Sequence, residues 1–140
     1  DIRMAAESAQ FSFPEVKVGA FASGSGTQRL PRLIGRGRAL DLLLTGRTVD
    51  AVEALDIGLV EYVIPDDKLL EKALDLAAQI AVNAAPAVAA TKHCVNIGLR
   101  DGFETGLAQE RQLRVKTGVG LDAAEGKAAF LEKRPSHFTE

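Results

Sequence analysis

Apolar and polar residues alternate with two different periods along this chain, and the change falls near residue 65. Residues 1–64 contain segments that alternate at every second position, as half-buried strands do, with glycine-rich turns between them. Residues 65–140 instead repeat their apolar positions at helical spacing, with short breaks between the stripes. The pattern therefore predicts an α/β chain, with a strand-containing region at 1–64 and a helical region at 65–140.

The first region is expected to hold two strands, one near each end, with short helical segments between them. The alternating stretches Ile2–Ala6 and Leu59–Ile64 predict the strands, and Pro65 ends the second one. Between them lies a glycine-rich turn at Gly19–Gly26. The helical segments are, in chain order, a helix that opens at Thr27–Leu30, a helix over Arg36–Leu44 stopped by Gly46, and a short turn over Ala51–Ile57 capped by Asp50 and ended by Gly58.

Four helices are predicted in the second region. The first helix is expected to start at Asp66 or Asp67 and the second at Pro86, with Gly98 and Gly102 as breaks in the second. The pairs Asp101–Glu104 and Asp122–Glu125 have capping-box spacing and predict the starts of the last two helices. Lys133, Arg134 and Pro135 predict the end of the final helix. These helices are rich in alanine and poor in aromatic residues, so their apolar faces are narrow. Because such faces usually need a partner surface, the sequence predicts an oligomer.

Composition and charge exclude several classes of partner. Hydrophobic residues make up 46% of the chain and charged residues 26%, the balance of an ordinary soluble domain. The net charge of -2 gives no basic field for nucleic acid, and polar residues interrupt every apolar run before membrane-spanning length. No secretory signal opens the chain. Cys94 is the single cysteine, which indicates a reducing compartment: the cytoplasm, or the mitochondrial matrix in a eukaryote.

Glu15 is the strongest candidate for chemistry. In an extended segment Glu15 would lie on the same face as Phe11 and Phe13, because the three occupy every second position. Pro14 favours extended or turn conformations beside it. A carboxylate on an apolar face loses hydration, which raises its pKa toward the range useful for proton transfer. The other interpretation is a surface glutamate paired with Lys17 or Arg29.

The stretch Gly24–Thr27 is a second candidate. Glycines before a helix can aim free backbone amides at an anion, a polarised carbonyl or a water. No Gly-Lys-Ser/Thr follows at P-loop spacing, and Arg29 stands where a dinucleotide-binding turn would have its third glycine. Simple helix capping is the alternative.

The remaining polar candidates are weaker. His93 and His137 lie far apart without further ligand spacing, so no metal site is predicted. Cys94 fits a small core residue in mid-helix. Lys127, Lys133 and Arg134 could hold phosphates, or could form an ordinary solvated helix end.

Taken together, these segments resemble the crotonase family, the enoyl-CoA hydratases and isomerases, across essentially the whole chain. The matching stretches are Asp1–Phe11, Phe13–Gly19 with its Pro-Glu pair, Gly26–Gly35, Leu44-Thr-Gly46, Glu53-Ala54, Gly58–Val60 and Glu125–Pro135. The resemblance implies the C-terminal part of a spiral of ββα turns, followed by a helical region that builds trimers, often paired into hexamers.

The same resemblance implies an acyl-CoA thioester as substrate and no separate cofactor, since coenzyme A is part of the substrate. Glu15 matches the second of two family glutamates, which exchanges the proton at the α-carbon and helps to hold the water. Ser23 and Gly24 match the turn that contacts the reacting groups. Phe130 and Lys133 match positions that help to bind the nucleotide end of CoA near a subunit interface.

Two departures from the family pattern affect these expectations. Most hydratases have Pro-Gly-Ala/Gly-Gly-Gly before Thr27, whereas this chain has Ala22-Ser-Gly-Ser-Gly26, with Ser23 in place of a glycine whose amide contacts the water. Family members are also about twice as long, and the chain opens inside a strand without Met, so we expect a fragment that lacks the oxyanion amides and the first glutamate. The leading prediction is a 2-enoyl-CoA hydratase; the alternatives are an enoyl-CoA isomerase or other crotonase activity, and a non-catalytic assembly fragment.

Overall fold

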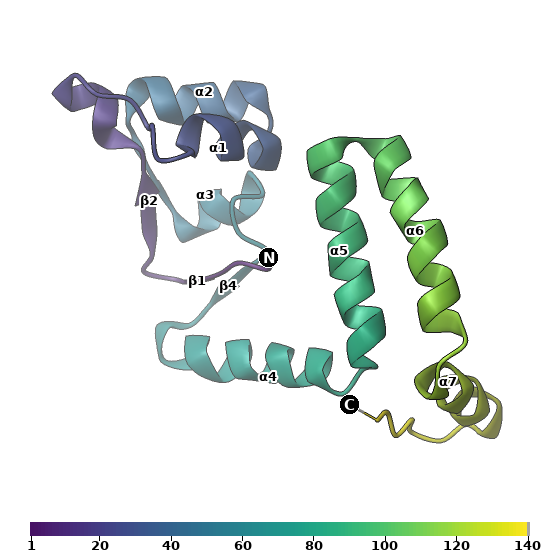
Figure 1. Ribbon diagram of the computed structural model, residues 1–140. Helices are drawn as coiled ribbons and strands as arrows, with labels where there is room; N and C mark the ends of the chain where they lie inside the picture. The colour runs from purple at the N-terminus through teal and green to yellow at the C-terminus, as the bar shows by residue number, and fades with distance from the viewer. Residues whose placement is uncertain (140) are drawn as a thin grey trace. The chain divides into compact units, whose positions relative to one another are not determined.

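The computed structural model describes residues 1–139 and forms two compact units, Asp1–Leu74 and Asp75–Glu140 (Figure 1). The boundary between the units falls inside one helix, α4 (Leu69–Ala81). The division of function between residues 1–64 and 65–140 stays a prediction. Each unit is described by itself below.

The first unit contains two small sheets and three α-helices. Its elements are β1 (Met4–Ala6), β2 (Gln10–Ser12), η1 (Pro14–Val18, a 3-10 helix), α1 (Gly26–Ile34), α2 (Arg36–Thr45), β3 (Thr48–Asp50), α3 (Ala51–Asp56), β4 (Tyr62–Ile64) and η2 (Asp66–Lys68, also 3-10). Strand β1 pairs with β4 in parallel, with Ala5 opposite Val63. Strand β2 pairs with β3 in antiparallel fashion, with Phe11 opposite Val49. The predicted strands at both ends of this region are therefore present, and each is shorter than its apolar pattern.

The core of the first unit lies between α1, α2, α3 and these strands. Its buried residues are Ala5, Leu30, Ile34, Ala39, Leu42, Val49, Ala51, Ala54, Ile57 and Val60. Ala51 and Ala54 are fully buried, and their small side chains let α3 lie close to β3 and β4. Helices α1 and α2 pack against each other and complete this layer (Figure 1). This core fixes the ends of β2 and α2, between which the candidate site lies.

Asp50 caps α3 as its position predicts, since its Oδ1 accepts a hydrogen bond from the Glu53 amide at 2.8 Å. Asp66 does not cap the following helix. Its carboxylate instead accepts hydrogen bonds from the amide and the hydroxyl of Ser8, in the loop after β1. The cap prediction was wrong at Asp66 because a nearby loop donor, which sequence spacing cannot show, competes for the same oxygens.

The second unit is built from helices. It contains the end of α4, then α5 (Ala85–Asp101), α6 (Phe103–Gly118) and α7 (Leu121–Glu132). Helices α5 and α6 form a hairpin and lie side by side (Figure 1). Gly98 was expected to break the second helix, but α5 continues through it to Asp101. The reason is packing: Gly98 faces Gly106 of α6, and a Cβ built on Gly106 would lie 2.9 Å from the Gly98 Cα.

The two predicted capping boxes are also wrong. Helix α6 begins after Gly102 and α7 begins after Gly120, and neither N-terminus has a side-chain cap. Asp101 lies inside α5, where its carboxylate pairs with Arg100 at 2.8 Å. Asp122 and Glu125 lie within α7 and hold the C-terminal tail instead of the helix start. Gly102, at φ 98°, accommodates the reversal before α6, whereas Gly120 precedes α7 in an extended conformation, so neither start uses an acid as its cap.

The apolar faces of the second unit are largely uncovered. Among residues 75–139, Gly106 and Ala129 alone are buried. Exposed apolar side chains include Val95, Leu99, Phe103, Leu121 and Leu131. This agrees with the narrow apolar faces read from the sequence. In the described residues no single helix has the length and apolarity to cross a membrane, and only α4 and α5 taken together, as a bent pair, reach that length and composition.

Candidate functional site

Glu15 lies in the 3-10 helix η1, not in an extended strand. Strand β2 ends at Ser12, and Pro14 occupies the first turn of η1. The expectation of a continuous extended segment was wrong because proline, with its fixed φ and missing N–H, favours a helix start over a further ladder position. Gly19 closes η1 in the left-handed conformation at φ 76°.

The Glu15 side chain is half-buried, and its Oε2 is shielded from solvent without any hydrogen-bond partner in the described residues. An ion pair with Lys17 or Arg29, the alternative that the sequence allows, is not among the ion pairs of residues 1–139. A shielded acceptor without a donor is costly in a folded protein and is typical of groups kept free for a ligand or a reaction. The unpartnered Oε2 therefore makes Glu15 the candidate carboxylate of this site.

A cavity of about 440 Å³ lies beside this helix, between η1, the glycine turn and α2. Val16, next to Glu15, forms part of its wall, as do Phe21 and Ala22 from the turn. The rest of its lining comes from α1 and α2 and is apolar apart from Thr27 and Arg36. The carboxylate itself does not line this cavity, but residues of η1 and of the glycine turn share its wall.

The glycine turn places its strain at Ser25, not at Ser23. The Ser23 amide donates a hydrogen bond to the Phe21 carbonyl at 2.6 Å, and Ser23 keeps an ordinary negative φ. Ser25 has φ 78° and is the residue before α1, where its carbonyl accepts from the amides of Gln28 and Arg29. The expected disturbance from a Cβ at Ser23 is therefore absent, and a side chain in the left-handed region appears two residues later. The amide of Gly24 donates to no acceptor in the described chain.

Ser25→Gly is expected to stabilise the protein by about 1 kcal/mol, because glycine adopts φ 78° without the Cβ clash. Urea unfolding followed by circular dichroism measures this change. Ser23→Gly is the matched control and should give no gain, since its φ already suits an L-residue. Equal effects of the two substitutions would contradict the assignment of strain to Ser25.

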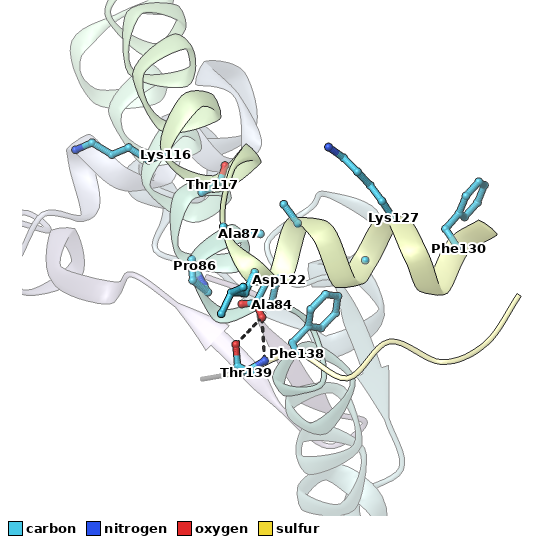
Figure 2. Close-up of a pocket in the computed structure, with 14 residues that line it drawn as sticks. Ala84, Pro86, Ala87, Lys116, Thr117, Asp122, Lys127, Phe130, Phe138 and Thr139 are labelled. Carbon is cyan, nitrogen blue, oxygen red and sulfur yellow. Dashed lines mark hydrogen bonds between the residues drawn. The ribbon is translucent and has the colours of Figure 1, made fainter. Parts of the chain in front are cut away.

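A second hollow, of about 760 Å³, lies in the helical unit around the start of α7 (Figure 2). Ala84, Pro86 and Ala87 line it from the start of α5, Lys116 and Thr117 from the end of α6, Gly120 from the connection to α7, Leu121, Asp122, Ala123, Gly126, Lys127 and Phe130 from α7, and Phe138 and Thr139 from the tail. Lys127 and Phe130 project from α7 in Figure 2. Phe130 and Lys133 are the two residues predicted from the sequence to contact CoA; of these, Phe130 lines the hollow and Lys133 does not. Lys133 instead ends α7 in the left-handed conformation.

The C-terminal tail folds back along α7 and forms one wall of this hollow. Arg134 forms a bidentate ion pair with Glu125, at 2.6 and 3.0 Å, and the His137 amide donates to the same carboxylate at 2.8 Å. Asp122 accepts hydrogen bonds from the amide and hydroxyl of Thr139 (Figure 2). We refer to residues 133–139 as the tail strap. Sequence patterns do not predict Lys116 or Phe138 in this hollow, because Phe138 reaches it through the folded strap and Lys116 reaches it from the end of α6.

Acid is expected to release the tail strap at an unusually low pH. The hydrogen bonds from Arg134 and then from the His137 amide lower the pKa of Glu125 from 4.5 to about 2. A pKa lowered by folding means that the contribution of this carboxylate to strap attachment is complete above pH 4.5 and is lost as the pH falls toward 2. NMR titration of the His137 amide should therefore show its midpoint near 2, and a midpoint near 4.5 would contradict the pairing.

A matched pair of substitutions tests the same strap at neutral pH. Glu125→Gln removes the anionic acceptor shared by Arg134 and His137, so the His137 amide should exchange its hydrogen faster. Glu132 also bonds Arg134, at 2.6 Å, but has no bond to the tail amides. Glu132→Gln should therefore leave His137 protected.

No group of three or more metal-ligating side chains occurs within residues 1–139. Cys94 is half-buried in α5, beside α6, where it acts as a small packing residue. In the described residues, the metal-ligating side chains and Cys94 therefore give no candidate site beyond the two described above.

Comparison with known families decides the relationship. The family model described as "Enoyl-CoA hydratase/isomerase" matches residues 1–140. The chain belongs to the enoyl-CoA hydratase/isomerase family. Its fold is accordingly the C-terminal portion of the crotonase fold: a crystal structure of enoyl-CoA hydratase from Bacillus anthracis superimposes with a TM-score of 0.94 and 43% identity, covering 99% of this chain and 54% of that one.

Curated relatives of this hydratase/isomerase family show the same coverage. A Mycobacterium tuberculosis protein named "Probable enoyl-CoA hydratase echA8" is 43% identical over 139 residues, which are 99% of this chain and 54% of that protein. The 2,3-dehydroadipyl-CoA hydratase of Escherichia coli is 38% identical over 138 residues, again 99% and 54%. The chain thus spans about half the length of the curated relatives that it matches.

Proposed function

We propose that this chain supplies the second carboxylate and the glycine turn of an enoyl-CoA hydratase, which adds water reversibly to a 2-enoyl-CoA thioester. One observation carries the proposal: Glu15 keeps a shielded carboxylate oxygen without a partner, on a segment packed beside the glycine turn. Names of the relatives support the reaction class. The rest of the site would come from the part of those relatives that this chain does not span.

In this reaction the water oxygen bonds to the β-carbon and a proton is added to the α-carbon. Glu15 would exchange the α-carbon proton and help to hold the water. A carboxylate oxygen without a hydrogen-bond partner is suited to this role because it is free to contact the reacting groups. Ser23 and Gly24 would lie against the reacting end of the substrate, where Gly24 has a free amide. No separate cofactor takes part.

The nucleotide end of CoA would bind at the second hollow, on α7. Phe130 is 83% exposed, which leaves its ring free to stack on a base, and Lys127 lines the same hollow. Lys133 sits at the end of α7 as an additional cation for phosphate. The uncovered helical faces would be buried in a homo-trimer or hexamer, the role that we assign to residues 65–140. The single Cys94 suits a reducing compartment such as the cytoplasm.

An isomerase is the second candidate, and one observation favours it. The Ser23 amide, which stands where hydratases use a glycine amide to hold the water, is occupied by the Phe21 carbonyl. An isomerase needs no added water, because one carboxylate moves a proton between two carbons of the substrate.

Incubation of the complete protein with a 2-enoyl-CoA in heavy-oxygen water separates the candidates. Label in a 3-hydroxyacyl-CoA product supports the hydratase, and a shifted double bond without label supports the isomerase. A protein that forms trimers by light scattering, binds no CoA ester and gives neither product would instead be a non-catalytic assembly fragment.

A further inference from the structure

Phe13 lies between the two glycines that border the candidate site. The edge of its ring, at Cε1, is 3.1 Å from the point where a Cβ on Gly26 would stand. Its carbonyl oxygen is 3.3 Å from the equivalent point on Gly46, the residue that ends α2. Both distances are short, and the Ala22 Cβ lies nearer still to the Gly26 point, at 2.8 Å, so a side chain at either glycine would have to displace Phe13 among its neighbours. The ring therefore rests on the glycine turn, and the Phe13 backbone rests on the end of α2.

Pro14 and Lys17 extend the second of these contacts. The Pro14 Cα is 3.3 Å from the Gly46 Cβ position, and the Lys17 Cε is 3.0 Å from it. Gly46 itself has φ 59°, which glycine adopts most readily. Glu15 stands between these two residues, so the segment that carries its carboxylate is held against the end of α2 by packing.

Glu15 has little else to orient it. Its shielded Oε2 has no hydrogen-bond partner in the described residues, whereas most positioned carboxylates are fixed by donors. A carboxylate oxygen without a donor is free to contact a substrate. The Glu15 carbonyl accepts a hydrogen bond from the Ala20 amide at 3.0 Å, so the position of the carboxylate relative to the turn comes from this backbone bond and from the packing of its chain neighbours.

The geometry points to Phe13 as a positioning residue that sets the distance between the Glu15 carboxylate and the glycine turn. This inference rests on the proposed function, because the turn and the carboxylate must act on one substrate. Phe13 is half-buried and packs at the edge of the core, so loss of its ring would let η1 move relative to Gly26. Misplacement of reacting groups by about 1 Å lowers a catalytic rate by about 10²-fold.

Phe11 provides a matched control. It is also a half-buried phenylalanine at the edge of the same core, two residues earlier on β2. It does not appear among the atoms nearest to Gly26 or Gly46. Phe11→Ala and Phe13→Ala should therefore destabilise the protein to similar extents, while only the second change separates Glu15 from the turn.

The test measures kcat, KM and exchange of the α-carbon proton in heavy water, for the complete protein and both variants. Phe13→Ala should lower kcat and the exchange rate together by at least about tenfold relative to Phe11→Ala, with KM within about twofold. Phe13→Leu, which refills much of the contact with Gly26, should recover most of the loss and serves if the alanine variant does not fold.

Equal losses in the Phe11 and Phe13 variants would show that Phe13 only stabilises the fold, and would overturn the inference. A loss confined to KM would overturn it as well, because mispositioning of the carboxylate acts on the chemical step. If the unsubstituted protein neither hydrates nor exchanges the substrate, the proposed function itself has failed. These outcomes are distinguishable within one set of measurements.

Discussion

Glu15→Gln in the complete protein is expected to lower kcat for hydration of a short 2-enoyl-CoA by about 10³-fold. An amide cannot exchange a proton at the α-carbon, and general acid–base catalysis contributes about 10² to 10⁴ in rate. KM should change little, because the substitution preserves shape and the substrate is held elsewhere by its CoA group. Steady-state kinetics with saturating substrate measures the effect.

The free energy of unfolding of the Glu15→Gln protein separates a catalytic role of Glu15 from a structural one. The shielded Oε2 of Glu15 has no partner to lose, so Glu15→Gln should leave the free energy of unfolding unchanged or raise it. Glu7→Gln, in the loop after β1 and exposed, is the control and should keep full activity. A Glu15→Gln protein that is fully active yet less stable would show that the carboxylate is structural and that the site lies elsewhere.

Gly106→Ala is expected to destabilise the helical unit by about 2 kcal/mol. The new Cβ would lie 2.9 Å from the Gly98 Cα and 3.4 Å from the Gly98 nitrogen, so it meets backbone that cannot move without separating α5 from α6. Overpacking of this kind costs about 1 to 3 kcal/mol, and it outweighs the gain of up to about 1 kcal/mol that alanine brings to a helix. Urea unfolding followed at 222 nm measures the loss.

Gly118→Ala is the matched substitution for this second prediction. Gly118 lies in the same helix, and nothing stands within 4 Å of its Cβ position. It should be neutral or slightly stabilising, because only helix propensity changes. If both variants have the same stability, α5 and α6 are not held at the close distance that Gly98 and Gly106 allow.

Part of the candidate site followed from the sequence. The apolar neighbours of Glu15 and the glycine content of the turn identify both as candidates from the sequence. Their proximity did not follow, because it depends on Phe13 contacting Gly26 and on Pro14 contacting Gly46, across 13 and 32 positions of the chain. The sequence also placed the unusual serine of the turn at Ser23, whereas the left-handed residue is Ser25. A backbone angle of this kind is set by the hydrogen bonds at the start of α1.

Helix caps and helix breaks likewise follow from the sequence only where the partner residue is close in the chain. Asp50 caps α3 because its partner lies three residues ahead, within reach of local pattern. Asp66, Asp122 and Glu125 bond to residues outside their own helix starts, so the same residue types did not act as caps. Gly98 does not break α5, because its lack of a side chain is used for packing against α6.

By itself, the sequence determined the α/β class, most of the helices, the strands at both ends of the first region, and the family, since periodicity and short ordered motifs are local properties of the chain. The tertiary structure alone decided that a Glu15 oxygen is shielded and unpaired, that Ser25 is left-handed, and that the tail strap forms a wall of the hollow on α7. The shielded oxygen and the strap arise from contacts between residues distant in the sequence, whereas the Ser25 angle accompanies its hydrogen bonds at the start of α1. Such contacts depend on how the elements pack, which no local pattern encodes.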